Sequence, residues 1–116
     1  MTTRRVKFTT CEARHEMPEP MPALFPNTVD PTDVGALDAI VHETLKERSI
    51  GAVDLYVTGL TVCVGAVIAY CVRHYIPLTL YHFDRATGGY YPQIVLDEAQ
   101  VGFLNAVARD AGTWLD

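Results

Sequence analysis

An arginine and a histidine stand side by side early in the chain, at Arg14 and His15. An imidazole can move a proton near neutral pH, and a guanidinium can hold a phosphate through two parallel hydrogen bonds. Together they could cleave a phosphodiester without a metal ion. The alternative is a solvated pair of surface charges. Of the remaining histidines, His42 and His74 fall on predicted helices and are interpreted as structural or surface groups, whereas His82, at a strand end, suits either role equally.

A second group, Thr58-Gly59-Leu60-Thr61, joins a predicted strand to a predicted helix. Glycine lets the backbone approach a ligand closely, and the first N–H groups of a helix attract anions. The segment therefore suits a phosphate. It lacks the full Gly-x-Gly-x-x-Gly pattern and a Walker lysine, so an ordinary tight turn capped by one of its threonines is the alternative.

A third group surrounds a predicted hairpin and consists of Tyr81, Tyr90, Tyr91 and Gln93. Aromatic rings stack on nucleobases, and glutamine can read a base edge. Because side chains alternate along a strand, Tyr90 and Tyr91 cannot face the same side, and at most one of them meets a ligand. Tyrosine also favours strands in its own right, so a purely structural role is the alternative.

Other chemistries fit the sequence less well. The acidic residues Glu12, Glu16 and Asp84 lack a recognised metal-ligand spacing, and the only serine is Ser49. A nucleophile is conceivable at Cys11, but no neighbour clearly activates it. We therefore expect no metal and no cofactor, and we favour acid–base chemistry by histidine.

The composition is that of a single globular domain spanning residues 1–116. The net charge is −5 and the nine basic residues are scattered, which disfavours long nucleic acid as a partner but permits a small phosphorylated ligand. Three cysteines without Cys-x-x-Cys spacing are expected to be reduced thiols. No apolar leader follows Met1, so a cytoplasmic location is expected.

An uncharged stretch of eighteen residues, Leu55–Val72, has the minimum length for a membrane span. Charged residues bound it at Asp54 and Arg73, and the turn-forming residues 58–61 interrupt it. Strand formers dominate its first part. We interpret it as a buried strand, a tight turn and a buried helix, and we expect no membrane association.

Alternating patterns predict strands at 4–11, 53–57, 77–83 and 90–95. The proline-rich segment 12–27 should be a surface loop. Helices are predicted from Asp30-Pro31 to Gly51, over 61–75, and over 97–114 with an inward face. That face consists of Val101, Leu104, Val107 and Ala108.

The order β-α-β-α-β-β-α predicts an α/β, minimal Rossmann-like three-layer fold. Its short sheet should be mostly parallel, with an antiparallel hairpin at one edge. Ligands of such sheets bind beyond the carboxyl ends of the strands. Residues 12–16, 58–61 and 81–85 should therefore share one rim.

Three segments also carry a family resemblance: Arg14-His15-Glu16, residues 54–61 (DLYVTGLT), and residues 78–85 (LTLYHFDR) with 89–93 (GYYPQ). They resemble the small CRISPR-associated Rossmann-like proteins of type III systems, related in style to CARF and SAVED sensor domains. The likeness is greatest to stand-alone ring nucleases, which cut cyclic oligoadenylate messengers. It covers residues 11–16 and 54–93, about half of the chain.

The resemblance implies a homodimer with a symmetric cyclic oligoadenylate lying across two rims, and a metal-independent cut by the ligand's own 2′-hydroxyl. Thr58, Gly59 and Thr61 would hold phosphate, with Leu60 beside them. His15 would be the acid or base, with His82 as the other candidate, and Arg14 or Arg85 would stabilise the phosphorane. Further ligand contacts are expected at Tyr81, His82, Tyr91 and Gln93. A sponge or sensor that binds the messenger without cutting it is the alternative function.

Overall fold

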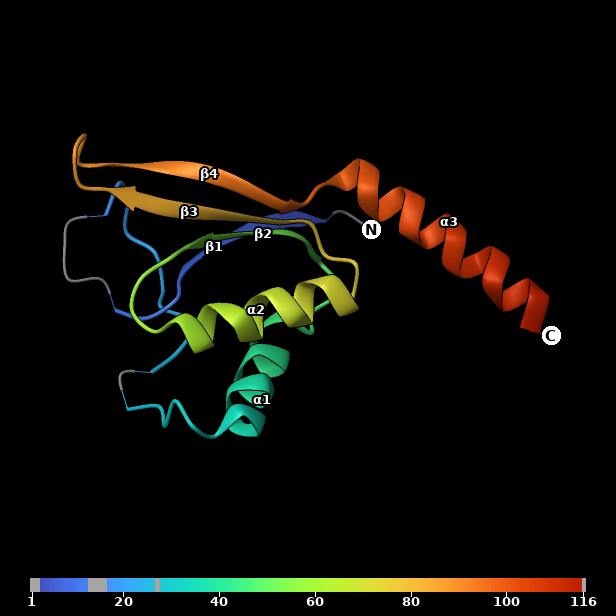
Figure 1. Cartoon of the computed structure of the whole chain (residues 1–116), viewed down its shortest axis with the longest axis horizontal. Helices are drawn as coiled ribbons and strands as arrows, with labels where there is room; N and C mark the ends of the chain where they lie inside the picture. Colours follow the sequence, from blue (N-terminus) through green and yellow to red (C-terminus); the bar gives the residue numbers. More distant parts are fainter. Residues whose placement is uncertain (1–2, 13–16, 27, 116) are drawn as a thin grey trace.

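The computed structural model of the chain describes residues 3–12, 17–26 and 28–115, with side chains as far as residue 110 (Figure 1). Arg14, His15 and Glu16 lie outside the described residues. The elements in chain order are β1 (Arg4–Thr9), α1 (Val34–Leu45), β2 (Ile50–Tyr56), α2 (Thr61–Arg73), β3 (Leu78–Asp84), β4 (Gly89–Leu96) and α3 (Glu98–Leu115).

The four strands form one sheet in the order β1-β2-β3-β4. β1 pairs with β2 and β2 with β3 in parallel, whereas β4 returns antiparallel to β3. The predicted mostly parallel α/β sheet with an antiparallel edge hairpin is therefore confirmed. Its three parallel strands end at the same edge, which we call the carboxyl edge.

Both crossover helices lie on the same face of this sheet (Figure 1). The strand order progresses in one direction, and right-handed crossovers in one direction must place their helices on one side. The helix face of the sheet is apolar, with Val53 and Leu55 fully buried against α1 and α2. The opposite face, here called the open face, carries no helix among the described residues, so the third layer of the predicted three-layer fold is not seen within one chain.

The proline-rich segment contributes to the core instead of only crossing the surface. Leu24 and Phe25 are buried, and the backbone N–H groups of these residues donate to the carbonyl oxygens of Thr9 and Thr10 at 2.8 and 3.0 Å. Ala23 forms an isolated parallel bridge with Thr9. The prediction of a surface loop was wrong here, because this end of the segment pairs in parallel with the end of β1 at the edge of the sheet.

Helix α1 begins three residues later than predicted. The carboxylate of Asp33 accepts a hydrogen bond from the N–H of Ala36 at 3.1 Å and is the true N-cap. Asp30 instead accepts from the N–H and hydroxyl of Thr32, which closes a turn before the helix. Both aspartates suit a cap, so the sequence pattern alone did not separate them.

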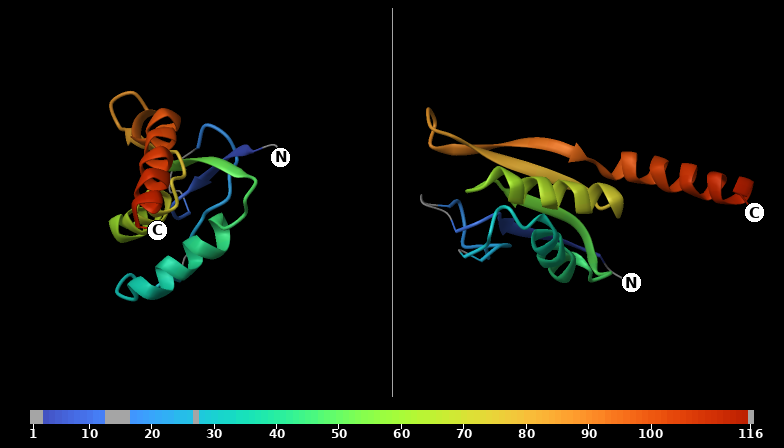
Figure 2. Two further views of the ribbon diagram at one scale, coloured as in Figure 1. Left: turned by 90° about the vertical axis from the view of Figure 1, so that its right-hand side faces the viewer. Right: turned by 60° about the horizontal axis from the view of Figure 1, so that its bottom comes forward.

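Helix α3 extends away from the body of the molecule (Figures 1 and 2). The radius of gyration is 15.5 Å, whereas about 13 Å is typical of a compact chain of this length. The predicted inward face was wrong for the single chain, since Val107 is 47% exposed and Ala108 is also exposed. α3 follows β4 after a single residue, Asp97, which gives the chain no room to fold back.

The uncharged stretch 55–72 divides as predicted between the end of β2, a turn and most of α2. Its helical part buries Cys63, Val67 and Cys71 against the sheet. No helix in the described ranges combines the length and apolar character that crossing a bilayer requires.

Candidate functional site

The loops that follow β1 and β2 are joined at the carboxyl edge by the side chain of Thr58. Its hydroxyl donates to the carbonyl oxygen of Cys11 at 2.6 Å and accepts from the N–H of the same residue at 3.0 Å. Thr58 is buried. The hydroxyl thus donates one hydrogen bond and accepts another within the protein. Thr58 therefore fixes the loop after β2 against the loop after β1 at the carboxyl edge.

Gly59 has the backbone conformation that the sequence pattern required of it. Its φ is +75°, in the left-handed region that glycine adopts without strain. A Cβ atom at this position would lie 3.0 Å from the Cβ and 3.1 Å from the Sγ of Cys11. The turn into α2 therefore packs its backbone directly against the loop that follows β1.

The amino end of α2 opens at the carboxyl edge. Leu60 is its N-cap and provides no side-chain hydrogen bond to the first turn. The Leu60 carbonyl accepts from the N–H groups of Cys63 and Val64 at 3.1 and 3.4 Å. Gly59, Leu60 and Thr61 are all exposed. An exposed helix start without a side-chain cap favours a bound anion through its N–H groups and the helix dipole.

His82, Tyr91 and Gln93 come together on the hairpin. His82 lies opposite Tyr91 in the β3–β4 register, with ring centroids 5.5 Å apart. The Nε2 of His82 lies 2.7 Å from the Oε1 of Gln93, a carbonyl oxygen that can only accept. The tautomer of His82 that donates from Nε2 satisfies this contact, and in that tautomer Nδ1 carries the lone pair. This group shares the helix face with Leu80, which is buried in the core.

Tyr81 points to the open face. Its ring stacks on Tyr56 at 4.6 Å, and Tyr90 contacts Tyr56 edge-on at 5.0 Å. A hollow of about 540 Å³ adjoins these rings. It is lined by Met17, Pro18, Tyr56, Tyr81, Gly88, Gly89 and Tyr90. Tyr90 and Tyr91 lie on opposite faces, as predicted, so the expected ligand residues divide between two sides of the sheet.

The hydroxyls of Tyr56 and Tyr90 at this hollow stay neutral at physiological pH. Burial raises the pKa of Tyr56 and of Tyr90 above the ordinary value of a phenol. The hydroxyl of Tyr90 donates a weak bond to the sulfur of Met17 at 3.2 Å. These rings therefore offer flat apolar faces and neutral hydrogen-bonding groups, which suits stacking better than proton transfer.

Arg85 stands apart from the exposed start of α2. It is exposed in the turn between β3 and β4. The last β3 residue paired with β2 is Tyr81, so the hairpin runs on alone through Asp84. At about 3.3 Å per residue, the four residues from Tyr81 place Arg85 roughly 13 Å beyond the end of β2 along the strand direction. Only a ligand that extends along the hairpin would contact both Arg85 and the exposed start of α2.

Three titratable groups elsewhere, His42, His74 and Asp54, have structural partners. His42 and His74 both contact the ring of Tyr70, as expected of structural histidines. The buried carboxylate of Asp54 pairs with Arg5 at 2.5 Å. Within residues 3–12, 17–26 and 28–115, no three His, Cys, Asp or Glu side chains gather in a way that could hold a metal ion.

The three cysteines are free thiols. Burial, with Cys11 beside it, raises the pKa of Cys63 to about 11, and burial raises the pKa of Cys71 to about 12. Cys11 is partly exposed at the carboxyl edge. Since the thiolate is the nucleophile, neither of the two α2 cysteines is suited to covalent chemistry.

Alkylation with iodoacetamide at pH 8 should therefore modify native protein at Cys11 alone. A thiol with a pKa of about 11 is ionised in only about one molecule in a thousand at this pH, and burial also blocks the reagent. Peptide mass spectrometry should show Cys63 and Cys71 reacting at least roughly 100-fold more slowly. In urea all three should react alike. Comparable native rates would contradict the packing of α2.

Local sequence patterns do not identify Tyr56 and Met17 as residues that line the hollow, or Cys11 as the residue that contacts Thr58 and Gly59. In the sequence Tyr56 stands out only as a strand former, although its spacing of two from the charged Asp54 indicates the face opposite the core. Met17 and Cys11 lie in loops, and no local pattern indicates what a loop residue contacts.

Comparisons with protein-family models, with curated protein sequences and with solved structures find no match for this chain.

Proposed function

We propose that this protein is a ring nuclease that degrades cyclic oligoadenylate second messengers of type III CRISPR antiviral defence in the cytoplasm. The proposal rests on the resemblance of residues 11–16 and 54–93 to that class. The observation that carries it is the exposed, uncapped start of α2 at the carboxyl edge, built on Gly59 with φ +75°. A phosphate is the ligand that such a helix start favours.

In this proposal the backbone N–H groups around Gly59, Leu60 and Thr61 hold a phosphate of the ligand. Thr58 contributes indirectly, by joining the two loops that form the edge. The 2′-hydroxyl of the ligand attacks the adjacent phosphorus and expels the 5′-oxygen, which leaves a linear product with a 2′,3′-cyclic phosphate. Arg14 or Arg85 would stabilise the phosphorane.

Proton transfer is assigned to His15, with His82 as the second candidate. The Nδ1 of His82 has the free lone pair that a base needs, because Nε2 donates to Gln93 at 2.7 Å. His82 is also the first β3 residue beyond the end of β2. A ligand seated at the edge would pass close to it.

An adenine of the ligand would stack at the tyrosine-lined hollow. The stacked pair of Tyr56 and Tyr81 provides a flat aromatic platform at the same end of the sheet. Phosphate and base subsites lie on opposite faces, so the ligand would bend over the carboxyl edge. A homodimer would present two such edges to one symmetric ring.

The alternative function is a sponge or sensor that binds the messenger intact. The hydrogen bonds of Thr58 and of His82 favour it, because both side chains are already held by partners within the protein. A preformed edge whose described side chains are held in this way would bind the messenger without cutting it.

Incubation with cyclic tri-, tetra- and hexa-adenylate in EDTA separates these functions. Linear products carrying a 2′,3′-cyclic phosphate would support the nuclease. Ligand that is held tightly but recovered intact would support the sponge and overturn the nuclease. If calorimetry detected no binding of any of the three rings, both functions would be excluded.

Exchange of His15 for alanine should lower the cleavage rate by about 10²- to 10⁴-fold while the dissociation constant changes little, because loss of a general acid or base affects the transition state. His74→Ala is the matched control, since that histidine contacts Tyr70 at the far end of α2. If His15→Ala cleaves normally and His82→Ala does not, the proton shuttle is His82.

A further inference from the structure

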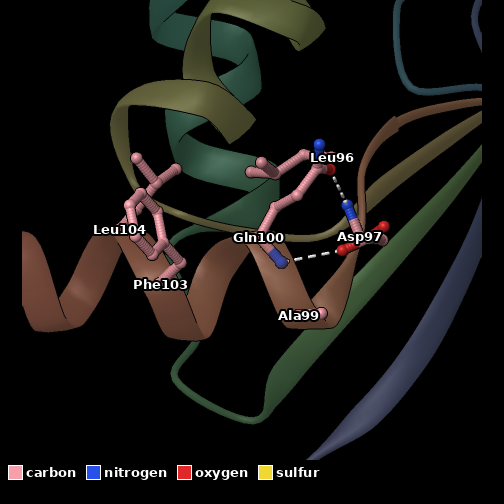
Figure 3. Close-up of a pocket in the computed structure, with 6 residues that line it drawn as sticks. All are labelled: Leu96, Asp97, Ala99, Gln100, Phe103 and Leu104. Atoms are coloured by element: carbon pink, nitrogen blue, oxygen red, sulfur yellow. Dashed lines mark hydrogen bonds between the residues drawn. The ribbon is translucent and has the colours of Figure 1, made fainter.

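Helix α3 presents a row of apolar side chains to solvent. Phe103 is 69% and Val107 is 47% exposed, and these residues lie one helical turn apart. Leu104 and Phe103 line an open hollow of about 450 Å³ together with Leu96 (Figure 3). Exposed phenylalanine and valine at this spacing form the side of a helix that normally packs against another element.

A helix in this position gains little stability from packing against its own chain. It spans 18 residues, has a glycine at position 102, and extends from the body (Figure 2). Most helical stability in proteins comes from packing of the apolar side and not from helix propensity. The apolar side of α3 therefore has no partner surface among the described residues of its own chain.

The open face of the sheet has an apolar surface near the first residues of α3 that a helix could cover. Ile94 of β4 is 64% exposed and lies beside Thr79 in the register. Both residues line a hollow of about 420 Å³ with Leu96 and Ala99, where β4 meets α3. Parallel sheets normally have both faces covered, and here α1 and α2 cover only one (Figure 1).

The connection between β4 and α3 directs the helix away from the open face of its own chain (Figure 1). Asp97 is the only residue between β4 and α3. Its N–H donates to the Oε1 of Gln100 at 2.8 Å, and the N–H of Gln100 donates to the Oδ1 of Asp97 at 2.7 Å (Figure 3). This reciprocal capping box fixes the direction in which the helix leaves the strand.

We propose that two copies of this chain exchange their α3 helices, so that each helix lies on the open face of the other copy around Thr79 and Ile94, clear of the tyrosine-lined hollow. An 18-residue helix is about 27 Å long and about 10 Å wide. The two exchanged helices and the faces they cover would together bury roughly 1,100 Å² of accessible surface. This area is close to the lower end of the range for stable protein interfaces. The exchanged helix supplies the third layer of the sheet. This proposal does not depend on the proposed ring-nuclease function.

Light scattering of the full chain after gel filtration, without nucleotide, tests the exchange. Wild type should have a mass of about 26 kDa, twice the 12.8 kDa of the chain. Phe103→Asp and Ile94→Asp should each weaken the dimer by roughly 10- to 100-fold. The matched control is Val72→Asp, which changes a residue of α2 that is 43% exposed and should leave the dimer intact.

Hydrogen exchange distinguishes loss of the dimer from loss of the fold. Amides 100–110 should be protected in wild type and should lose that protection in Ile94→Asp, which lies outside α3, while α1 and α2 stay protected. A wild type that is monomeric at every concentration would overturn the proposal. A dimer that Phe103→Asp breaks and Ile94→Asp does not would also overturn it, because the helices would then pair with each other.

Discussion

Exchange of Gly59 for alanine is expected to lower the free energy of unfolding by about 2 to 4 kcal/mol. Part of this is the strain of holding a residue with a Cβ at φ +75°, which costs about 1 to 2 kcal/mol. The rest arises because the added Cβ would lie 3.0 Å from the Cβ of Cys11. Urea denaturation followed by circular dichroism measures the change.

Two other glycines separate these contributions. Gly88 has φ +72° but nothing within 4 Å of an added Cβ, so Gly88→Ala should show the strain alone. Gly65 lies in the interior of α2 with open space around it, so Gly65→Ala should be neutral or stabilising by up to about 1 kcal/mol. If Gly59→Ala lowered the free energy of unfolding no more than Gly88→Ala does, the close contact between residue 59 and Cys11 would be contradicted.

Thr58→Val is expected to destabilise the protein by a similar amount, about 2 to 4 kcal/mol. Valine has nearly the shape of threonine, but it leaves the N–H and the carbonyl of Cys11 without the hydroxyl that bonds both. Unpaired buried backbone groups cost about 1 to 3 kcal/mol each. Thermal or urea unfolding gives the value directly.

The matched control is Thr44→Val in α1. The hydroxyl of Thr44 donates only to the Ile40 carbonyl one turn earlier, at 2.9 Å. Since that oxygen already belongs to the helix ladder, its loss should cost less than about 0.5 kcal/mol. Thr58→Ser keeps the hydroxyl and should recover most of the stability. Equal losses at positions 44 and 58 would show that Thr58 does not join the two loops.

Both substitutions also bear on the proposed ligand site, although neither residue would carry out the chemistry. Gly59 and Thr58 set the position of the first turn of α2 relative to the loop after β1. Variants that remain folded should therefore bind cyclic oligoadenylate more weakly. Gly65→Ala and Thr44→Val should bind it as wild type does.

Local sequence patterns were sufficient for the elements and for the class of fold. Alternation in β1 and the apolar run of β2 predicted strands, and two strand–helix–strand units imply parallel pairing. The turn at Gly59 and the opposite orientation of Tyr90 and Tyr91 also followed from residue type and spacing. These features depend on chain geometry within a few residues, which the sequence specifies directly.

Contacts between distant segments were decided only in three dimensions. Thr58 reaches Cys11 across 47 positions, and Phe25 enters the core from a segment rich in proline. The inward face expected for α3 depended on a chain reversal that the single residue between β4 and α3 does not allow. An amphipathic pattern specifies that a helix needs a partner surface, but the connection to its neighbours determines which surface it can reach.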